Sequence, residues 1–374
     1  MGKDVISGNV GKERIIEYDI IKGICILMVC LAHTGHGAYF MEYGFLYAFF
    51  FASGCTFCHK SFWVFLKSKI VRIYVPFVLA NMAGYFIGKF YYSLSGYQGY
   101  GYTLKEAVKK VLTFQIAENI MSPSWFLLPM FLVTFAFYFL QSIFMKVKYR
   151  DELILGISFL IYLTGLFLRH NINQIIWNRC AVVYNVSYAL FFCALGYYYH
   201  HHNNKIKEFL FGKYGIELFI ISILFLTEIN QHYEYSQDLR YGQISSAKLN
   251  VFVAFISVYT IVYVSRCVCK APLFAKLFCL FGRRSMEIML FHIASFGIVT
   301  FAFHWIMNWG YPMTWTFGYY SEALSYINTF AGVVIPAFIM EVYSIVKGYF
   351  MKLDVKRLKY RPIIQKEVYY EETE

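Results

Sequence analysis

Long apolar runs recur along almost the whole chain and are separated by short polar connections. A helix needs about 20 mostly apolar residues to cross the roughly 30 Å hydrocarbon core of a bilayer. The runs are continuous rather than alternating, which is typical of membrane helices and not of β-barrel strands. The pattern therefore predicts an all-α integral membrane protein of about ten transmembrane helices. The predicted spans are residues 17–37, 43–60, 74–94, 125–145, 152–169, 181–200, 214–231, 247–265, 285–308 and 325–346.

No long polar linker interrupts the series of apolar runs. Residues 1–350 are therefore expected to form one transmembrane domain. Residues 351–374 are basic at first and become acidic at their end. This segment is predicted to be a cytoplasmic tail that is partly disordered.

The positive charges follow the connections between the runs. The chain has 34 Lys and Arg against 22 Asp and Glu, a net charge of +12. Basic residues gather in the connections 60–72, 146–150, 205–213 and 266–284. These connections alternate along the predicted topology, as the positive-inside rule requires, whereas the long connection 95–124 follows the rule weakly. Both termini are therefore expected in the cytoplasm, in a multi-pass protein of the inner (cytoplasmic) membrane, and no nucleic-acid partner is expected.

The composition agrees with a protein that faces lipid. Apolar residues make up 59% of the chain and charged residues only 15%, against about a quarter in soluble proteins. Nine cysteines are present, and Cys55 and Cys58 form a C-x-x-C. Because no second pair or histidine follows at zinc-like spacing, the cysteines are read as small helix residues. No metal is expected.

The first apolar run contains two ionisable residues that are expensive to keep in a membrane, Lys22 and His33. Such residues are functional candidates by default. Their separation of eleven residues corresponds to about 16 Å along a helix and brings both close to one face. Lys22 would then lie near the cytoplasmic edge and His33 deeper in the bundle. The structural alternatives are a Lys22 side chain that reaches the interface and a His33 that only bonds a neighbouring helix.

Several motifs occur in an order that resembles one family. Lys22 followed eleven positions later by His33 resembles the first helix of the membrane acyltransferase-3 family, the polysaccharide O-acetyltransferases. FFFASGC resembles the phenylalanine-rich second helix of that family, in which Ser53-Gly54 would let two helices pack closely. Three later pieces fit the same order: KIVRIYVP (69–76), SWFLLPMF (124–131) and GRRSMEIMLFH (282–292). Lys69 stands where many members have Arg, and it lacks the bidentate fork of that side chain.

The resemblance implies an enzyme that moves an acetyl group from cytoplasmic acetyl-CoA to a sugar hydroxyl. His33 would be the general base or a transient acyl carrier, two roles that the sequence does not separate. Lys22, Lys69 and Arg72 would bind the phosphates of the donor. His292 is a second catalytic candidate, and Glu287, one turn earlier, would orient a neighbouring side chain.

The acceptor is expected to be a cell-envelope glycan or a lipid-linked sugar, met within the lipid bilayer. A transporter of a glycan or an acyl-bearing metabolite is the alternative, because many spans with buried charges also describe a carrier. Binding of acetyl-CoA would discriminate between the two. The identity of the glycan, the acyl chain and the oligomeric state stay open.

Overall fold

Helices occupy all ten predicted spans. The computed structural model describes residues 15–36, 43–95, 101–171, 174–202, 204–233, 235–307 and 322–359. The helices at the predicted spans are α1 (Ile16–His33), α3 (Phe45–Cys55), α5 (Val75–Ser95), α7 (Leu127–Ile143), α8 (Arg150–Asn171), α9 (Gln174–His201), α11 (Gly215–His232), α12 (Ala247–Cys269), α14 (Ser285–Met307) and α15 (Glu322–Lys359). Shorter elements are α4 (Phe62–Lys69), η1 (Ile70–Tyr74), α6 (Leu104–Leu112), η2 (Asn119–Phe126), α10 (Asn204–Phe211) and α13 (Pro272–Arg283). Two short strands, β1 (Gln237–Asp238) and β2 (Gln243–Ile244), pair antiparallel.

Seven helical segments within the described part of the chain are long and apolar enough to cross a membrane. They are 62–90, 119–143, 150–169, 181–201, 247–269, 285–303 and 324–349. Of the other three predicted spans, α3 is apolar but has only 11 residues. α1 carries Glu17, Asp19 and Lys22, and α11 has 18 residues that include Glu217 and Glu228. The all-α integral membrane fold is therefore confirmed.

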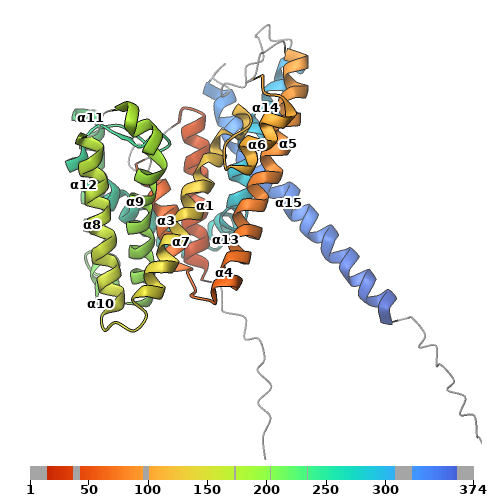
Figure 1. The fold of residues 1–374 in the computed structure, drawn as a ribbon. Helices are drawn as coiled ribbons and strands as arrows, with labels where there is room; N and C mark the ends of the chain where they lie inside the picture. Colours follow the sequence, from red (N-terminus) through yellow and green to blue (C-terminus); the bar gives the residue numbers. More distant parts are fainter. Residues whose placement is uncertain are drawn as a thin grey trace, which may run out of the picture.

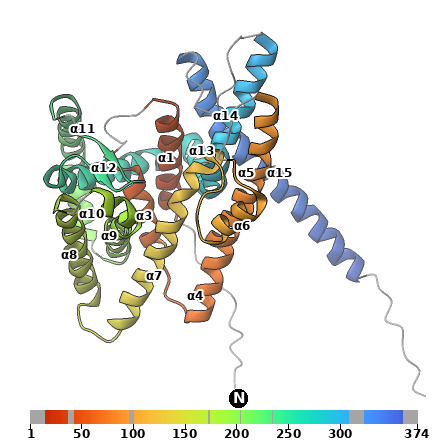
Figure 2. The same cartoon turned by 45° about the horizontal axis from the view of Figure 1, so that its top comes forward.

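α1 lies at the centre of the bundle. It contacts α3 and α12 on one side and α13, α14 and α15 on the other, and Figures 1 and 2 show it between these two groups of helices. Most of its side chains are buried, including Ile20, Ile24 and Cys30. A helix enclosed in this way can keep polar groups only where partners or cavities meet them.

Two glycine pairs bring helix backbones into direct contact. A Cβ atom added at Gly54 of α3 would lie 1.8 Å from the Cys193 carbonyl oxygen of α9, and one at Gly196 of α9 would lie 1.9 Å from the Phe51 oxygen. At the contact of α1 with α13, a Cβ atom at Gly23 would lie 2.1 Å from the Phe278 oxygen, and one at Gly282 would lie 1.8 Å from the Asp19 oxygen. The close-packing role predicted for Ser53-Gly54 is therefore confirmed for the glycine.

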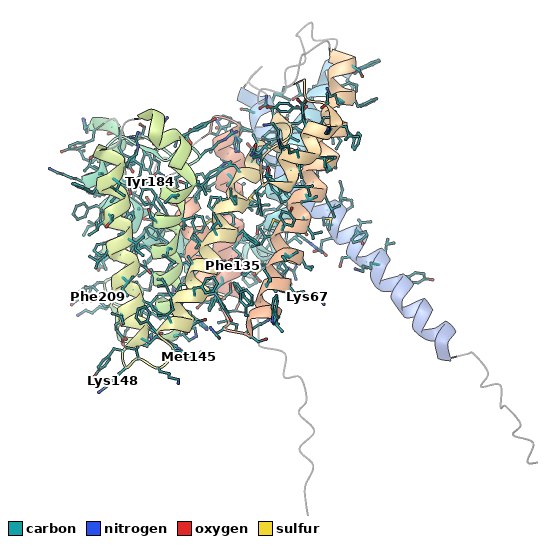
Figure 3. All side chains as sticks on the ribbon, in the orientation of Figure 1. Lys67, Phe135, Met145, Lys148, Tyr184 and Phe209 are labelled. Carbon is teal, nitrogen blue, oxygen red and sulfur yellow. The ribbon has the colours of Figure 1, made fainter. Side chains whose placement is uncertain are left out.

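The connections predicted to face the cytoplasm gather at one end of the molecule, which we call the inner end. Figure 3 places Lys67, Met145 and Lys148 at this end, and Tyr184 lies toward the opposite, outer end. The labels of α4 and α10 mark the same inner end in Figure 1. The basic connections 60–72, 146–150 and 205–213 thus share one side, as the charge pattern requires.

α15 extends away from the bundle along its second half (Figures 1 and 2). Arg284, beside α14, fixes its middle, because the Arg284 Nε atom donates to Glu341 Oε1 at 2.9 Å. The helix continues through Lys359, nine residues into the predicted tail. Residues 360–374 of that tail lie outside the described residues.

Candidate functional site

Two cavities lie along α1, one toward each end. The outer cavity, about 550 Å³, is lined by His33 of α1 and by parts of α3, η2 and residues 235–241. The inner cavity, about 600 Å³, is lined by Lys22 of α1 and by parts of α3, α4 and η1. Both volumes fall in the range of small-molecule sites, roughly 300–1,000 Å³. Lys22 and His33 therefore face different cavities and do not form one contact pair.

The lining positions of the two cavities come closest along the chain on α3. Phe49 lines the outer cavity and Ser53 lines the inner one. These positions are four residues apart, or about 6 Å along a helix. On α1 the nearest lining positions are Val29 and Lys22, about 10 Å apart. The two cavities share no lining residue.

His33 is placed by the end of α1. It is the last residue of the helix, and Thr34 follows as the C-cap. The Thr34 hydroxyl donates to the Leu31 carbonyl at 3.1 Å and lies 2.6 Å from the hydroxyl of Thr329 on α15. Because Thr34 is fixed to a second helix, the position of the His33 ring at the cavity wall is fixed as well.

His292 of α14 lies beside His33, with 5.1 Å between the ring centroids and an interplanar angle of 37°. The His292 side chain is fully buried, and it does not line the outer cavity. Its Nδ1 atom lies 2.9 Å from the Ile288 carbonyl oxygen. A carbonyl oxygen only accepts, so Nδ1 carries the proton and Nε2 of the neutral ring holds a lone pair. Within the described residues that Nε2 atom has no hydrogen-bond partner.

The inner cavity carries an excess of positive charge. Lys22, Lys60, Lys69 and Arg72 line it, and Asp19 is its one carboxylate among the described residues. Arg72 lies in η1, a π-helical turn within the continuous helix that α4 and α5 form with it. Such turns are frequent at functional sites because the added residue changes the direction of side chains. The structure thus brings together all three residues predicted to bind the donor.

Glu287 lies elsewhere. Its carboxylate is 3.7 Å from Arg284, the side chain that also bonds Glu341. Glu287 lines neither cavity, and five residues of helix separate it from His292, which turns the two side chains about 140° apart. The orienting role predicted for Glu287 stays a prediction, and the structure gives it an ion-pair partner instead.

Two residues that line the His33 cavity were not predicted from the sequence. Trp125 of η2 and Arg240, at the turn of the β1–β2 hairpin, line this cavity. Trp125 lies inside the quoted SWFLLPMF segment, and Gly242 in a polar stretch between two apolar runs signals the hairpin. Those signals mark a turn, but they do not say which cavity it covers.

The arrangement provides a base in one cavity and cations in the other. A neutral imidazole such as His33 can accept the proton of a hydroxyl nucleophile. Lysine and arginine side chains bind phosphate groups through charge-assisted hydrogen bonds. In the part of the chain that the structure describes, no three His, Cys, Asp or Glu side chains are grouped to hold a metal ion.

Comparison with known proteins identifies the family. Residues 15–342 match the acyltransferase-3 family model, described as an acyltransferase domain, and all residues that line the two cavities fall in this range. No curated protein and no solved structure matches the chain significantly. The chain, a multi-pass membrane acyltransferase, therefore belongs to the acyltransferase-3 family.

Proposed function

We propose that the protein is an O-acyltransferase of the inner membrane that moves an acetyl group from cytoplasmic acetyl-CoA to a hydroxyl of a cell-envelope glycan. The observation that carries the proposal is that two ionisable residues of α1 face two separate cavities. Lys22 faces the cationic inner cavity, and His33 faces a separate cavity at the outer end. A donor and an acceptor that arrive from opposite sides of a membrane need two such sites.

The donor fits the inner cavity by charge. The phosphates of acetyl-CoA are polyanionic, and four cations against one carboxylate line this cavity. Lys69 lies against the Phe65 ring, with 5.4 Å from its Nζ atom to the centroid, which holds the aliphatic stem in place. Arg72 is exposed at the cavity, where its planar fork suits a phosphate.

The acceptor fits the outer cavity by shape and chemistry. Its wall combines aromatic rings with polar side chains, among them Trp125, Ser122 and Gln237. Sugars present both apolar C–H faces and hydroxyls, which such a wall can contact. His33 would accept the proton of one sugar hydroxyl while the oxygen of that hydroxyl attacks the thioester carbonyl.

Bonds and protons balance in this transfer. The new C–O ester bond forms, the C–S bond of the thioester breaks, and the coenzyme leaves as a thiol after it receives the proton. An alternative route passes the acetyl group through a covalent acyl-His33 intermediate. In both routes the thioester reaches His33 while the acetyl group is still bonded to the coenzyme, which requires the arm of the coenzyme to pass Phe49 and Ser53.

The first experiment replaces the base. His33→Ala should reduce acetylation of the host glycan by about a hundredfold or more, the scale of a lost general base. His232→Ala is the matched control, because His232 is exposed at the end of α11 and lines neither cavity. Mass spectrometry of the glycan gives the acetyl content, and membrane extracts give the amount of inserted protein. Equal acetylation by His33→Ala and His232→Ala would contradict the proposal.

The second experiment separates the acyltransferase from a glycan exporter. An acyltransferase with this donor site should bind acetyl-CoA, and Arg72→Ala should weaken the binding. An exporter that handles only the glycan should not bind the coenzyme. Titration of purified protein in detergent with acetyl-CoA gives the dissociation constant.

A further inference from the structure

The β1–β2 hairpin covers the His33 cavity with residues held from three sides. The Gln237 Nε2 atom donates to the Tyr43 carbonyl at 2.7 Å. The Asn250 Nδ2 atom of α12 lies 2.6 Å from the Tyr235 hydroxyl. The Arg169 Nε atom of α8 donates to the Gly242 carbonyl at 3.0 Å. These tethers fix the hairpin, so its side chains are preorganised toward the cavity.

The turn of this hairpin carries a charged side chain into the wall. Gly242 has a φ of 60°, a conformation that glycine adopts without strain. The Asp238 carboxylate accepts the backbone N–H of Arg240 at 3.0 Å, a local bond typical of turns. The turn therefore presents Arg240 beside Tyr241, and both side chains line the cavity with His33.

The Arg240 guanidinium forms no ion pair with any carboxylate of the described residues. It is half-buried and lies over the Tyr241 ring, 5.3 Å from the centroid. Asp238 is the one carboxylate that lines the cavity, and it forms no ion pair with Arg240 within the described residues. A partly desolvated guanidinium that forms no direct ion pair is stabilised when an anion binds it. Its planar fork of donors matches carboxylate and phosphate groups.

We propose that Arg240 binds an anionic group of the acceptor, a carboxylate or a phosphate, and so holds a neighbouring hydroxyl at His33. The inference rests on the proposed function, because it concerns the acceptor of the same transfer. The substrate class is then an acidic sugar or a phosphate-linked sugar, and not a neutral glycan. Arg240 is a specificity residue in this scheme, and His33 remains the base.

Binding of small sugars to purified protein in detergent tests the inference without any transfer step. The probes are methyl β-glucoside, which is neutral, glucuronic acid, which carries a carboxylate, and glucose 1-phosphate, which carries a phosphate. At least one anionic probe should raise the melting temperature of the protein at millimolar concentration more than the neutral probe does. The carboxylate and phosphate arms identify which anion the acceptor carries.

Three variants give the test its specificity. Arg240→Gln should raise the dissociation constant of the anionic probe by about tenfold to a hundredfold, the scale of a lost charged hydrogen bond. Arg240→Lys keeps the charge without the fork and should retain part of the affinity. Lys248→Gln removes an exposed charge at the start of α12, outside the cavity, and should bind like the unmodified protein.

The outcomes separate the two proposals. Equal binding of neutral and anionic probes, or unchanged anion binding by Arg240→Gln, would overturn the anion site even if acetylation still depends on His33. Anion binding that requires Arg240 in a protein whose acetylation ignores His33 would overturn the proposed function and leave the anion site standing. A monodisperse elution profile for Arg240→Gln and Arg240→Lys shows that a loss of binding is not a loss of folding.

Discussion

The contact of α3 with α9 makes a quantitative prediction for Gly54→Ala. A Cβ atom at this position would lie 1.8 Å from the Cys193 carbonyl oxygen, and ordinary contacts begin at 3.4 Å. The two backbones would therefore have to separate by 3.4 − 1.8 = 1.6 Å. The clash is with a backbone carbonyl oxygen of α9, so no side chain can rotate away. Overpacking of this kind costs about 1–3 kcal/mol or more of unfolding free energy.

Gly156→Ala is the matched control. Gly156 lies in α8, and nothing lies within 4 Å of a Cβ atom built there. Alanine in an open helical position stabilises by roughly 0.5–1 kcal/mol relative to glycine. The same chemical change should therefore lower the melting temperature of the detergent-solubilised protein at Gly54 and raise it slightly at Gly156.

The displacement should also reach the chemistry. α3 contributes Phe49 to the outer cavity and Ser53 to the inner one, so a shift of α3 moves both walls. A misplacement of about 1 Å can reduce a transfer rate by roughly a hundredfold. Acetylation per inserted copy should fall in Gly54→Ala and stay unchanged in Gly156→Ala. A melting temperature of Gly54→Ala at or above that of Gly156→Ala would refute the backbone contact.

Three substitutions test the roles of His292, Arg72 and Glu287. His292→Ala should reduce acetylation by roughly ten- to a hundredfold. The dissociation constant of acetyl-CoA should stay unchanged, because His292 lies beside His33 and not at the inner cavity. An equal loss of coenzyme binding would point to a folding defect instead. Arg72→Ala should raise the acetyl-CoA dissociation constant about tenfold in titrations of purified protein. Lys105→Ala, in α6, is the control and should leave this constant unchanged. Equal affinities of the two variants would contradict a role of Arg72 in binding the coenzyme. Glu287→Gln should keep acetylation within about threefold of the unmodified protein. It should change the free energy of unfolding by less than about 1 kcal/mol, because Glu287 pairs with a partly exposed Arg284. A severe loss of acetylation in cells would support the predicted orienting role of Glu287.

The pattern of apolar residues predicted the features that depend only on residues close together in the sequence. Apolar runs report where a helix avoids water, so a helix lies at each of the ten predicted spans, and seven helical segments of the described residues are long and apolar enough to cross a membrane. Helical rise fixes the distance between Lys22 and His33 whatever the surrounding fold is. The placement of these two residues toward opposite ends of one helix needed no information beyond the sequence of that helix.

Contacts between distant segments were not accessible from the same pattern. His292 lies beside His33, but no periodicity relates residues on α1 and α14. Arg240 is one basic residue in a short polar connection, where charge alone predicts a solvated loop. Only the three-dimensional tethers of the hairpin place it over the cavity. Glu287 illustrates the opposite case, in which a nearby sequence position is turned to another helix face.

The ionisable residues of α1 discussed above, Glu17, Lys22 and His33, lie toward its two ends and not in its middle. Glu17 at the start of the helix accepts the Tyr199 hydroxyl at 3.1 Å and lies 3.9 Å from Arg266, so its charge is compensated. Lys22 and His33 line the inner and the outer cavity, respectively. Between them every residue from Gly23 to Ala32 is without an ionisable carboxylate or amine, and α3 closes the gap with Phe49 and Ser53. Under the proposed transfer, the charged nucleotide part of the coenzyme would stay in the inner cavity and the polar glycan in the outer one, while the uncharged acetyl thioester passes about one helical turn of α3.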